Sequence, residues 1–211
     1  MVPSSGAGAG SKDAGGQLAT LTLEHSRTMK LGEGALYVRY SPTTRTDKLL
    51  VAVSLLDNTV KVFFEDTLKF FLSLYGHRLP VMSMDVSRDG TLLVTASSDK
   101  NVKIWGLDFG DCHRSMFAHE DSVMSVKFIG RTHMFCTAGK DGLLKIWDAD
   151  RFRLVHECRG HYGEAWACQP SPSGTFLVTV GHDRSIRVWE RSQEQVFVDM
   201  ERERERDTAA D

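Results

Sequence analysis

Four side chains suited to acid–base or hydrogen-bonding chemistry recur together along the chain: a histidine, a threonine, an aspartate and a tryptophan. Each is repeated at a spacing of 42 residues. A His–Asp pair beside a hydroxyl has the residue types of a nucleophilic catalytic site. The same groups could instead form a closed, buried hydrogen-bond network. The three sets are His77, Thr95, Asp99 and Trp105; His119, Thr137, Asp141 and Trp147; and His161, Thr179, Asp183 and Trp189.

The segment before the first set favours a structural network over catalysis. The tryptophan position is taken by Phe63, the threonine position by Val53 and the histidine position by Leu31, and only Asp57 is kept. Replacing hydrogen-bond partners together avoids leaving a buried polar group unpaired. One active site would also not recur three times at the same spacing. We therefore expect all twelve residues to be structural and the protein not to be an enzyme.

The elements that would position these residues are short strands. Apolar residues alternate with polar ones, and turns such as Arg88–Gly90 come every 8–12 residues, as in all-β arrays. A period near 40–45 residues, opened by Gly76–His77 and closed by Trp105, resembles the WD40 repeat of β-propellers. We expect an all-β fold of WD40 blades in four repeats. Their approximate ranges are 31–74, 76–117, 118–159 and 160–200.

The ends of the chain differ from the repeats. Residues 1–16 are rich in Gly, Ala and Ser, which predicts a flexible leader. Residues 17–31 resemble half a blade, with an outer strand at Arg27–Lys30, and residues 201–211 form a charged tail. The repeat region therefore spans 17–200. Four repeats and a half-blade predict an incomplete propeller, and hence a piece of a longer product, because an open array leaves two faces uncovered.

Composition narrows the functional classes. The net charge of −2 gives no overall electrostatic footprint for nucleic acid or membranes. No apolar run approaches the roughly 20 residues of a membrane span, and no secretory segment is evident. Cys112, Cys136, Cys158 and Cys168 lack metal-ligand spacing, which predicts reduced thiols and no metal or cofactor.

Three binding functions known for propellers can be checked against the sequence, two by a short motif and one by clustered positive charge. Lipid-binding propellers carry Phe-Arg-Arg-Gly, whereas this chain has Cys158-Arg159-Gly160. Cullin ubiquitin-ligase receptors often carry Trp-Asp-x-Arg, whereas here Asp150 follows Trp147-Asp148-Ala149. Phosphate contacts of RNA need clustered positive charge. Candidates for such contacts are Lys100, Lys103, Lys145, Arg151, Arg153, Arg184 and Arg187.

Several stretches are more specific than the repeat itself. They are Val53–Phe63, Asp66–His77, Asp99–His113 and Phe117–Val123, with Trp105–Cys112 (Trp-Gly-Leu-Asp-Phe-Gly-Asp-Cys) the most distinctive. From about Leu21 to Met200, the chain resembles the Dip2/Utp12 family of the small-subunit processome. It departs from that family by lacking most blades and the C-terminal helical domain.

The resemblance implies a non-enzymatic scaffold in the nucleus and nucleolus. Family members belong to the UTP-B subcomplex and act in pre-rRNA processing and maturation of the small ribosomal subunit with its 18S rRNA. The implied partners are UTP-B and other processome subunits, with small nucleolar RNA and pre-rRNA reached through the complex. No membrane or small-molecule substrate is implied. The alternative is a generic WD40 adaptor, such as a ubiquitin-ligase substrate receptor.

Overall fold

The computed structural model describes residues 24–42 and 49–192. The chain divides into two compact units, Met1–Lys30 and Leu31–Asp211. Parts of four expected segments lie outside the described residues: the leader at 1–16, the start of the half-blade at 17–23, the end of the fourth repeat at 193–200, and the charged tail at 201–211.

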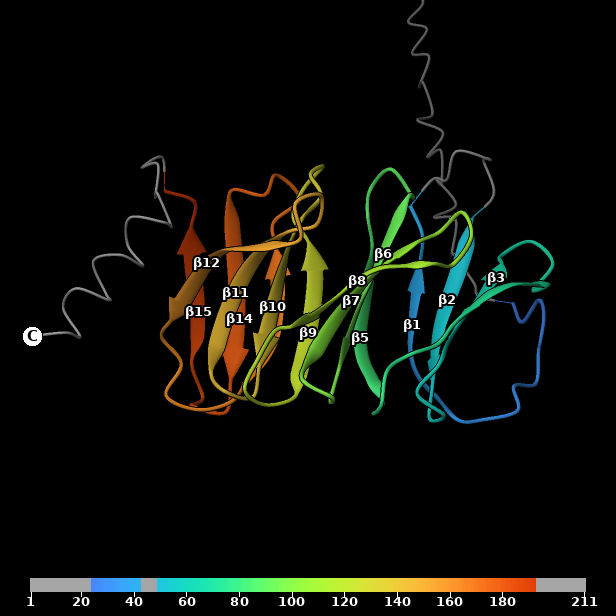
Figure 1. Ribbon diagram of the computed structural model, residues 1–211, viewed down its shortest axis with the longest axis horizontal. Helices are drawn as coiled ribbons and strands as arrows, with labels where there is room; N and C mark the ends of the chain where they lie inside the picture. Colours follow the sequence, from blue (N-terminus) through green and yellow to red (C-terminus); the bar gives the residue numbers. More distant parts are fainter. Residues whose placement is uncertain (1–23, 43–48, 193–211) are drawn as a thin grey trace, which may run out of the picture. The chain divides into compact units, whose positions relative to one another are not determined.

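The second unit consists of antiparallel sheets that follow one another along the sequence (Figure 1). Blade one is β1 (Ala35–Tyr40), β2 (Leu50–Leu55), β3 (Val60–Phe64) and β4 (Phe70–Leu74). Blade two is β5 (Val81–Val86), β6 (Leu92–Ser97), β7 (Asn101–Gly106) and β8 (Cys112–Phe117). Blade three is β9 (Val123–Phe128), β10 (Met134–Gly139), β11 (Leu143–Asp148) and β12 (Arg153–Arg159). The described part of blade four is β13 (Ala165–Pro170), β14 (Phe176–Gly181) and β15 (Ile186–Glu190).

In every blade an aspartate builds the turn between the second and third strands. Its carboxylate accepts the backbone N–H two residues further on, at 3.0 to 3.1 Å in all four blades. The residue between adopts the left-handed conformation that glycine and asparagine favour. These residues, again 42 apart, are Asn58, Lys100, Gly142 and Arg184, with φ of 67°, 71°, 79° and 60°. The turn therefore needs aspartate even in blade one, where the rest of the network is missing.

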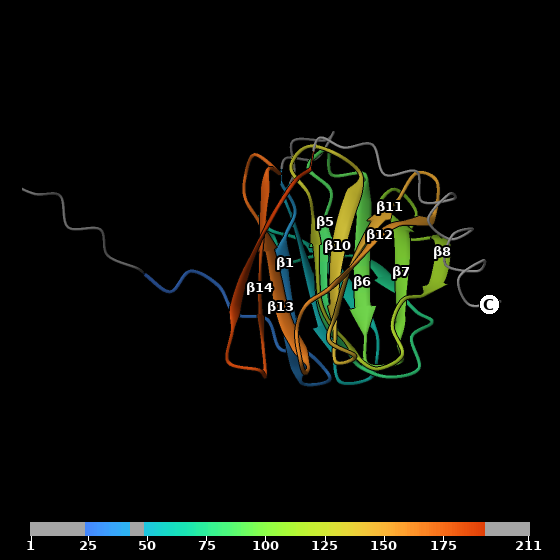
Figure 2. The same cartoon turned by 90° about the vertical axis from the view of Figure 1, so that its left-hand side faces the viewer.

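Neighbouring blades are joined by apolar clusters and by hydrogen bonds between their inner strands. The hydroxyl of Ser83 on β5 accepts the backbone N–H of Val126 on β9 at 3.2 Å. The hydroxyl of Ser125 on β9 accepts the backbone N–H of Cys168 on β13 at 3.3 Å. Figure 2, seen along the row of sheets, shows the strands of blade two following one another in the order β5, β6, β7, β8. The repeat thus positions equivalent residues in equivalent places in successive blades.

The expected fold class is confirmed: the described residues form WD40 blades, and their sheets do not close into a ring. The expected outer strand at Arg27–Lys30 is wrong, because residues 24–30 contain no strand. A strand gains its backbone hydrogen bonds from a neighbouring strand, and the described residues of the first unit contain none to pair with.

Candidate functional site

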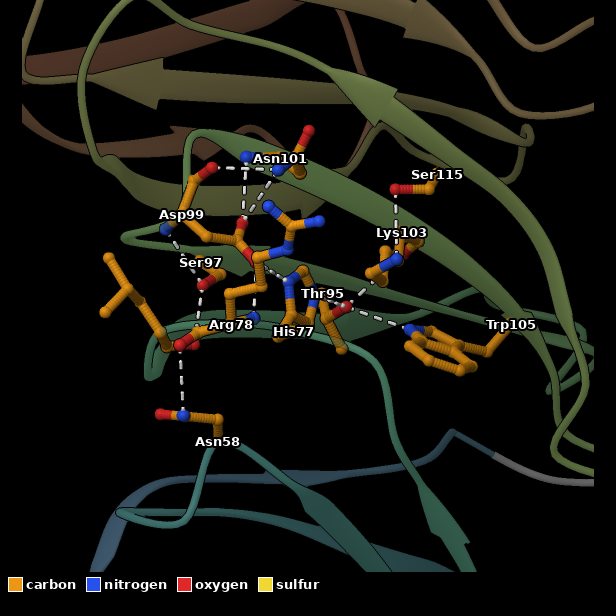
Figure 3. Close-up of polar contacts among 11 residues, drawn as sticks. Asn58, His77, Arg78, Thr95, Ser97, Asp99, Asn101, Lys103, Trp105 and Ser115 are labelled. Carbon is orange, nitrogen blue, oxygen red and sulfur yellow. Dashed lines mark hydrogen bonds and ion pairs between the residues drawn. The ribbon is translucent and has the colours of Figure 1, made fainter.

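The candidate site in blade two is a continuous hydrogen-bonded chain (Figure 3). Trp105 donates its indole Nε1–H to Thr95 Oγ1 at 2.9 Å. Thr95 Oγ1 lies 2.8 Å from His77 Nε2, and His77 Nδ1 lies 2.9 Å from an Asp99 carboxylate oxygen. All three contacts are satisfied when the hydroxyl donates to Nε2 and Nδ1–H donates to the carboxylate.

Blades three and four repeat this chain with nearly identical geometry. Tryptophan to threonine is 2.9 Å and threonine to histidine is 2.8 Å in both blades. Histidine to aspartate is 2.9 Å in blade three and 3.0 Å in blade four. The structure therefore brings together all twelve residues singled out in the sequence, as three separate sets.

Each network ties four parts of its blade together. In blade two, His77 precedes the inner strand, Thr95 lies on β6, Asp99 in the β6–β7 turn and Trp105 on β7. Asp99 also accepts the backbone N–H of Arg78 at 2.9 Å, which holds the loop before β5. The carbonyl of Arg78 in turn accepts from the Asn58 amide of blade one at 3.2 Å (Figure 3). The network thus connects the strands of blade two and, through Arg78, reaches the preceding blade.

Burial argues against catalysis at these sites. Thr95, Thr137 and Thr179 are all fully buried, so a substrate cannot reach their hydroxyls. Each hydroxyl already accepts from tryptophan and contacts histidine, as a satisfied buried network requires. In blade one the replacements Val53 and Phe63 are buried apolar side chains, and Asp57 bonds only within its turn, to Thr59.

The network aspartates have pKa values below the usual range. Burial alone would raise the pKa of Asp99, but the hydrogen bond from His77 and the backbone N–H of Arg78 outweigh it and hold that pKa well down. Burial is likewise outweighed for Asp141, whose pKa is lowered by His119. At Asp183 the hydrogen bond from Ser185 lowers the pKa first, and the bond from His161 adds to it.

Acid is therefore expected to unfold the blades progressively. A carboxylate whose folded pKa is depressed stabilises the protein above its unfolded pKa, about 3.9, and loses that contribution as pH falls toward the folded pKa. We expect urea midpoints to be steady from about pH 6 to 5 and to fall steeply below about pH 4. The variant Asp141→Asn, which cannot lose that charge, should show a shallower fall. Parallel acid profiles for the two proteins would contradict this assignment.

The basic residues considered for RNA contact are partly engaged. Lys103 donates to Ser115 at 3.0 Å, Lys145 pairs with Glu157 at 3.4 Å, and Arg187 pairs with Asp183 at 3.6 Å. Their charge is thus directed at their own blades. The others are exposed: Lys100, Arg151, Arg153 and Arg184.

A second polar cluster, which sequence reasoning missed, joins blades two and three. His133 Nδ1 lies 2.7 Å from an Asp150 oxygen and Nε2 lies 3.1 Å from an Asp89 oxygen. Asp89 follows β5, whereas His133 and Asp150 flank the β10–β11 hairpin. Burial lowers the pKa of His133, but the two carboxylates outweigh it and raise that pKa above its usual value. One residue of repeat two and two residues of repeat three take part, and the cluster is not repeated, so the 42-residue period gave no signal.

This His133 bridge predicts a stability that declines with rising pH. A histidine with a raised folded pKa contributes fully below its unfolded pKa, about 6.5, and loses the contribution as pH rises through the folded value. Because the groups are partly exposed, the loss is expected to be below about 1 kcal/mol between about pH 6 and 8. Urea denaturation of the protein and of His133→Gln at both pH values measures it. The difference between the two should shrink at the higher pH, and a constant difference would contradict the bridge.

Other site types find no support in the described residues. No group of three or more His, Cys, Asp or Glu residues there is placed to hold a metal ion. No helix in that part of the chain could span a bilayer. All four cysteines are free, and Cys136 and Cys168 lie side by side in the core with their sulfurs 3.5 Å apart.

The fold and the repeated network together define a WD40 β-propeller protein. The chain belongs to the family described as the WDR3 second beta-propeller domain, whose model matches residues 9–196.

Known relatives resemble part of the chain. It is 56% identical over 68 residues to the U3 small nucleolar RNA-associated protein 12 of Saccharomyces cerevisiae, and this match covers 32% of the chain and 7% of that protein. It is 54% identical over 70 residues to the WD repeat-containing protein 3 of Homo sapiens, and this match covers 33% of the chain and 7% of that protein. The matched segment is thus a small part of these relatives' length.

A solved structure has the same fold. That of U3-55K matches with a TM-score of 0.70 and 20% identity, covering 79% of this chain and 52% of that one. At this identity the likeness shows the fold alone.

Proposed function

We propose that this chain is a non-enzymatic propeller scaffold of the small-subunit processome, acting in the nucleolus in pre-rRNA processing and maturation of the small ribosomal subunit. The observation that carries the proposal is the family match over residues 9–196, together with 56% identity to a protein named for association with U3 small nucleolar RNA. The proposed partners are UTP-B and other processome subunits, with small nucleolar RNA and pre-rRNA reached through them.

The twelve network residues have a structural role in this proposal. Their threonines are fully buried and their hydrogen bonds are directed at one another, so they stiffen blades and present no reactive group to a ligand. Docking of partners then falls to loops and outer strands.

A ubiquitin-ligase adaptor is the second candidate, and the structure gives it less support. The receptor motif has an arginine after Trp-Asp-x, but this chain has Asp150 after Trp147-Asp148-Ala149. Asp150 lies 2.7 Å from His133 and takes part in the contact between blades two and three. Arg151, the next residue, is 4.0 Å from Asp148 and points its charge at its own turn.

Affinity purification of a tagged chain from cells of its own source tests the proposal. Co-purification of UTP-B subunits and U3 small nucleolar RNA is the expected result. RNase treatment before elution distinguishes the two routes, because protein partners bound directly stay after the RNA is removed. Recovery of cullin subunits without processome proteins would favour the adaptor.

A matched control separates specific recovery from binding to unfolded chain. The double variant Trp105→Ala and Trp147→Ala removes the network from two blades and should lose the processome partners. Phe109→Lys changes a side chain that is 90% exposed and should leave the fold intact. Equal recovery with all three proteins would count against the proposal.

A further inference from the structure

The loop that carries the chain from blade one to blade two is held in place by its neighbours. It spans residues 75–80, between β4 and β5. The backbone N–H of Arg78 donates to Asp99 at 2.9 Å, and the carbonyl of Arg78 accepts from the Asn58 amide at 3.2 Å (Figure 3). The carbonyl of Leu79 accepts from a serine hydroxyl on β6 at 2.8 Å. The backbone of this loop is therefore fixed before any partner binds.

The side chains of the same loop are exposed although its backbone is engaged. Tyr75 is 67% exposed and Leu79 is 48% exposed. Arg78, in the loop, and Lys100, in the β6–β7 turn, are exposed cations. The two cations are close together, because Arg78 donates its backbone N–H to Asp99, the residue before Lys100. We name the set of Tyr75, Arg78, Leu79 and Lys100 the loop patch.

The exposure of these positions does not depend on where the row of blades begins or ends. The position of Tyr75 is taken in blade two by Phe117, which is 58% exposed although blade two has a described blade on each side. The positions of the next two loop residues are taken in blade three by Glu120 and Asp121, which are also exposed. The loop before an inner strand therefore presents these positions to solvent within the row as well.

The loop patch differs in charge from the equivalent loop of blade three. Arg78 and Lys100 are positively charged, whereas their equivalents there are Glu120 and Gly142. The carboxylate of Asp99, which lies between the two cations in the structure, is already bonded to the network histidine and to the loop backbone. The loop patch thus combines two exposed cations with the two apolar surfaces of its other members.

We propose that the loop patch binds a peptide segment of a protein partner in which apolar side chains stand next to carboxylates. The carboxylates are complementary to the exposed cations. The apolar side chains are removed from water against Tyr75 and Leu79. Because the loop backbone is fixed beforehand, little ordering is needed on binding. The proposal rests on the scaffold role proposed above, to which it adds the chemical class of a partner.

Single-stranded RNA is the competing class of ligand, and the loop patch suits it less. Such RNA is bound by grooves of clustered positive charge that carry aromatic rings on which successive bases stack. The loop patch has one aromatic ring and two cations. The equivalent loop of the next blade carries Glu120 and Asp121, whose charges repel phosphate groups. A protein segment is therefore the better match.

Peptide selection on the purified full chain tests the proposal. A phage-displayed library of random short peptides is selected on the chain, and the enriched peptides are synthesised with a fluorescent label. We expect them to share Asp or Glu next to Leu, Ile or Phe, and to bind more weakly as the salt concentration rises. The double variant Arg78→Glu and Lys100→Glu should weaken their binding about tenfold or more, and so should Leu79→Ser.

A matched control comes from blade three. Glu120→Ala changes the exposed equivalent of Arg78 and should leave peptide affinity unchanged. Near-UV circular dichroism should be the same for all variants, because each changes only exposed side chains. Enriched peptides without carboxylates, or affinities that the patch variants leave unchanged, would overturn the proposal. Oligouridylate that binds more tightly than the peptides and is lost with the double variant would assign the loop patch to RNA instead.

This experiment and the test of the proposed function can fail separately. The selection contains no processome component, so a negative result would leave the processome assignment standing. Conversely, affinity purification without processome proteins would leave a measured peptide affinity of the loop patch unaffected.

Discussion

Replacing Trp147 with alanine is expected to lower the free energy of unfolding by about 3 to 5 kcal/mol, the range for removing a buried tryptophan. Trp147 lies in the cluster between blades two and three and stacks on Phe135, with ring centroids 6.3 Å apart. Its loss leaves a cavity in that junction and removes the donor to Thr137 Oγ1. Urea denaturation followed by circular dichroism measures the change.

Two controls separate the cavity from the hydrogen bond. Trp147→Phe keeps an aromatic ring, as blade one does with Phe63, and removes the N–H, so a loss of about 1 to 2 kcal/mol is expected. Trp189→Ala removes the equivalent residue of blade four, which is only partly buried, and should cost less than Trp147→Ala. If Trp147→Ala cost under about 1.5 kcal/mol, the tryptophan would not be holding the junction.

Asp141→Ala is expected to cost about 3 kcal/mol or more, because several groups lose their acceptor at once. Asp141 accepts from His119 Nδ1 at 2.9 Å and from the backbone N–H groups of Glu120 and Leu143 at 3.0 and 3.1 Å. His119 is fully buried and would be left with an unpaired N–H. Thermal and urea unfolding of the variant give the value.

Blade one supplies the matched control. Asp57 occupies the same turn position but bonds only to Thr59, and no histidine faces it. Asp57→Ala should therefore cost about 1 kcal/mol, the value of a lost turn or cap bond. Similar costs for the two substitutions would mean that the turn, and not the network, is what Asp141 stabilises.

The amino-acid sequence by itself determined the blades and their networks. The 42-residue spacing of His77, His119 and His161 predicts equivalent positions in successive sheets. The joint change to Leu31, Val53 and Phe63 in the first repeat indicates partners that act together. Such positions can be inferred from the sequence because each network lies within one blade, where short-range strand pairing and turns set every position.

Only the tertiary structure decided the contacts between blades. Asp89 meets His133 across a junction, and Lys127 on β9 donates to the Tyr37 hydroxyl on β1 at 2.8 Å, past the intervening blade. Arg39 likewise reaches Asp85 at 2.7 Å. Such pairs follow from how the sheets stack, and they involve residues that do not recur with the period.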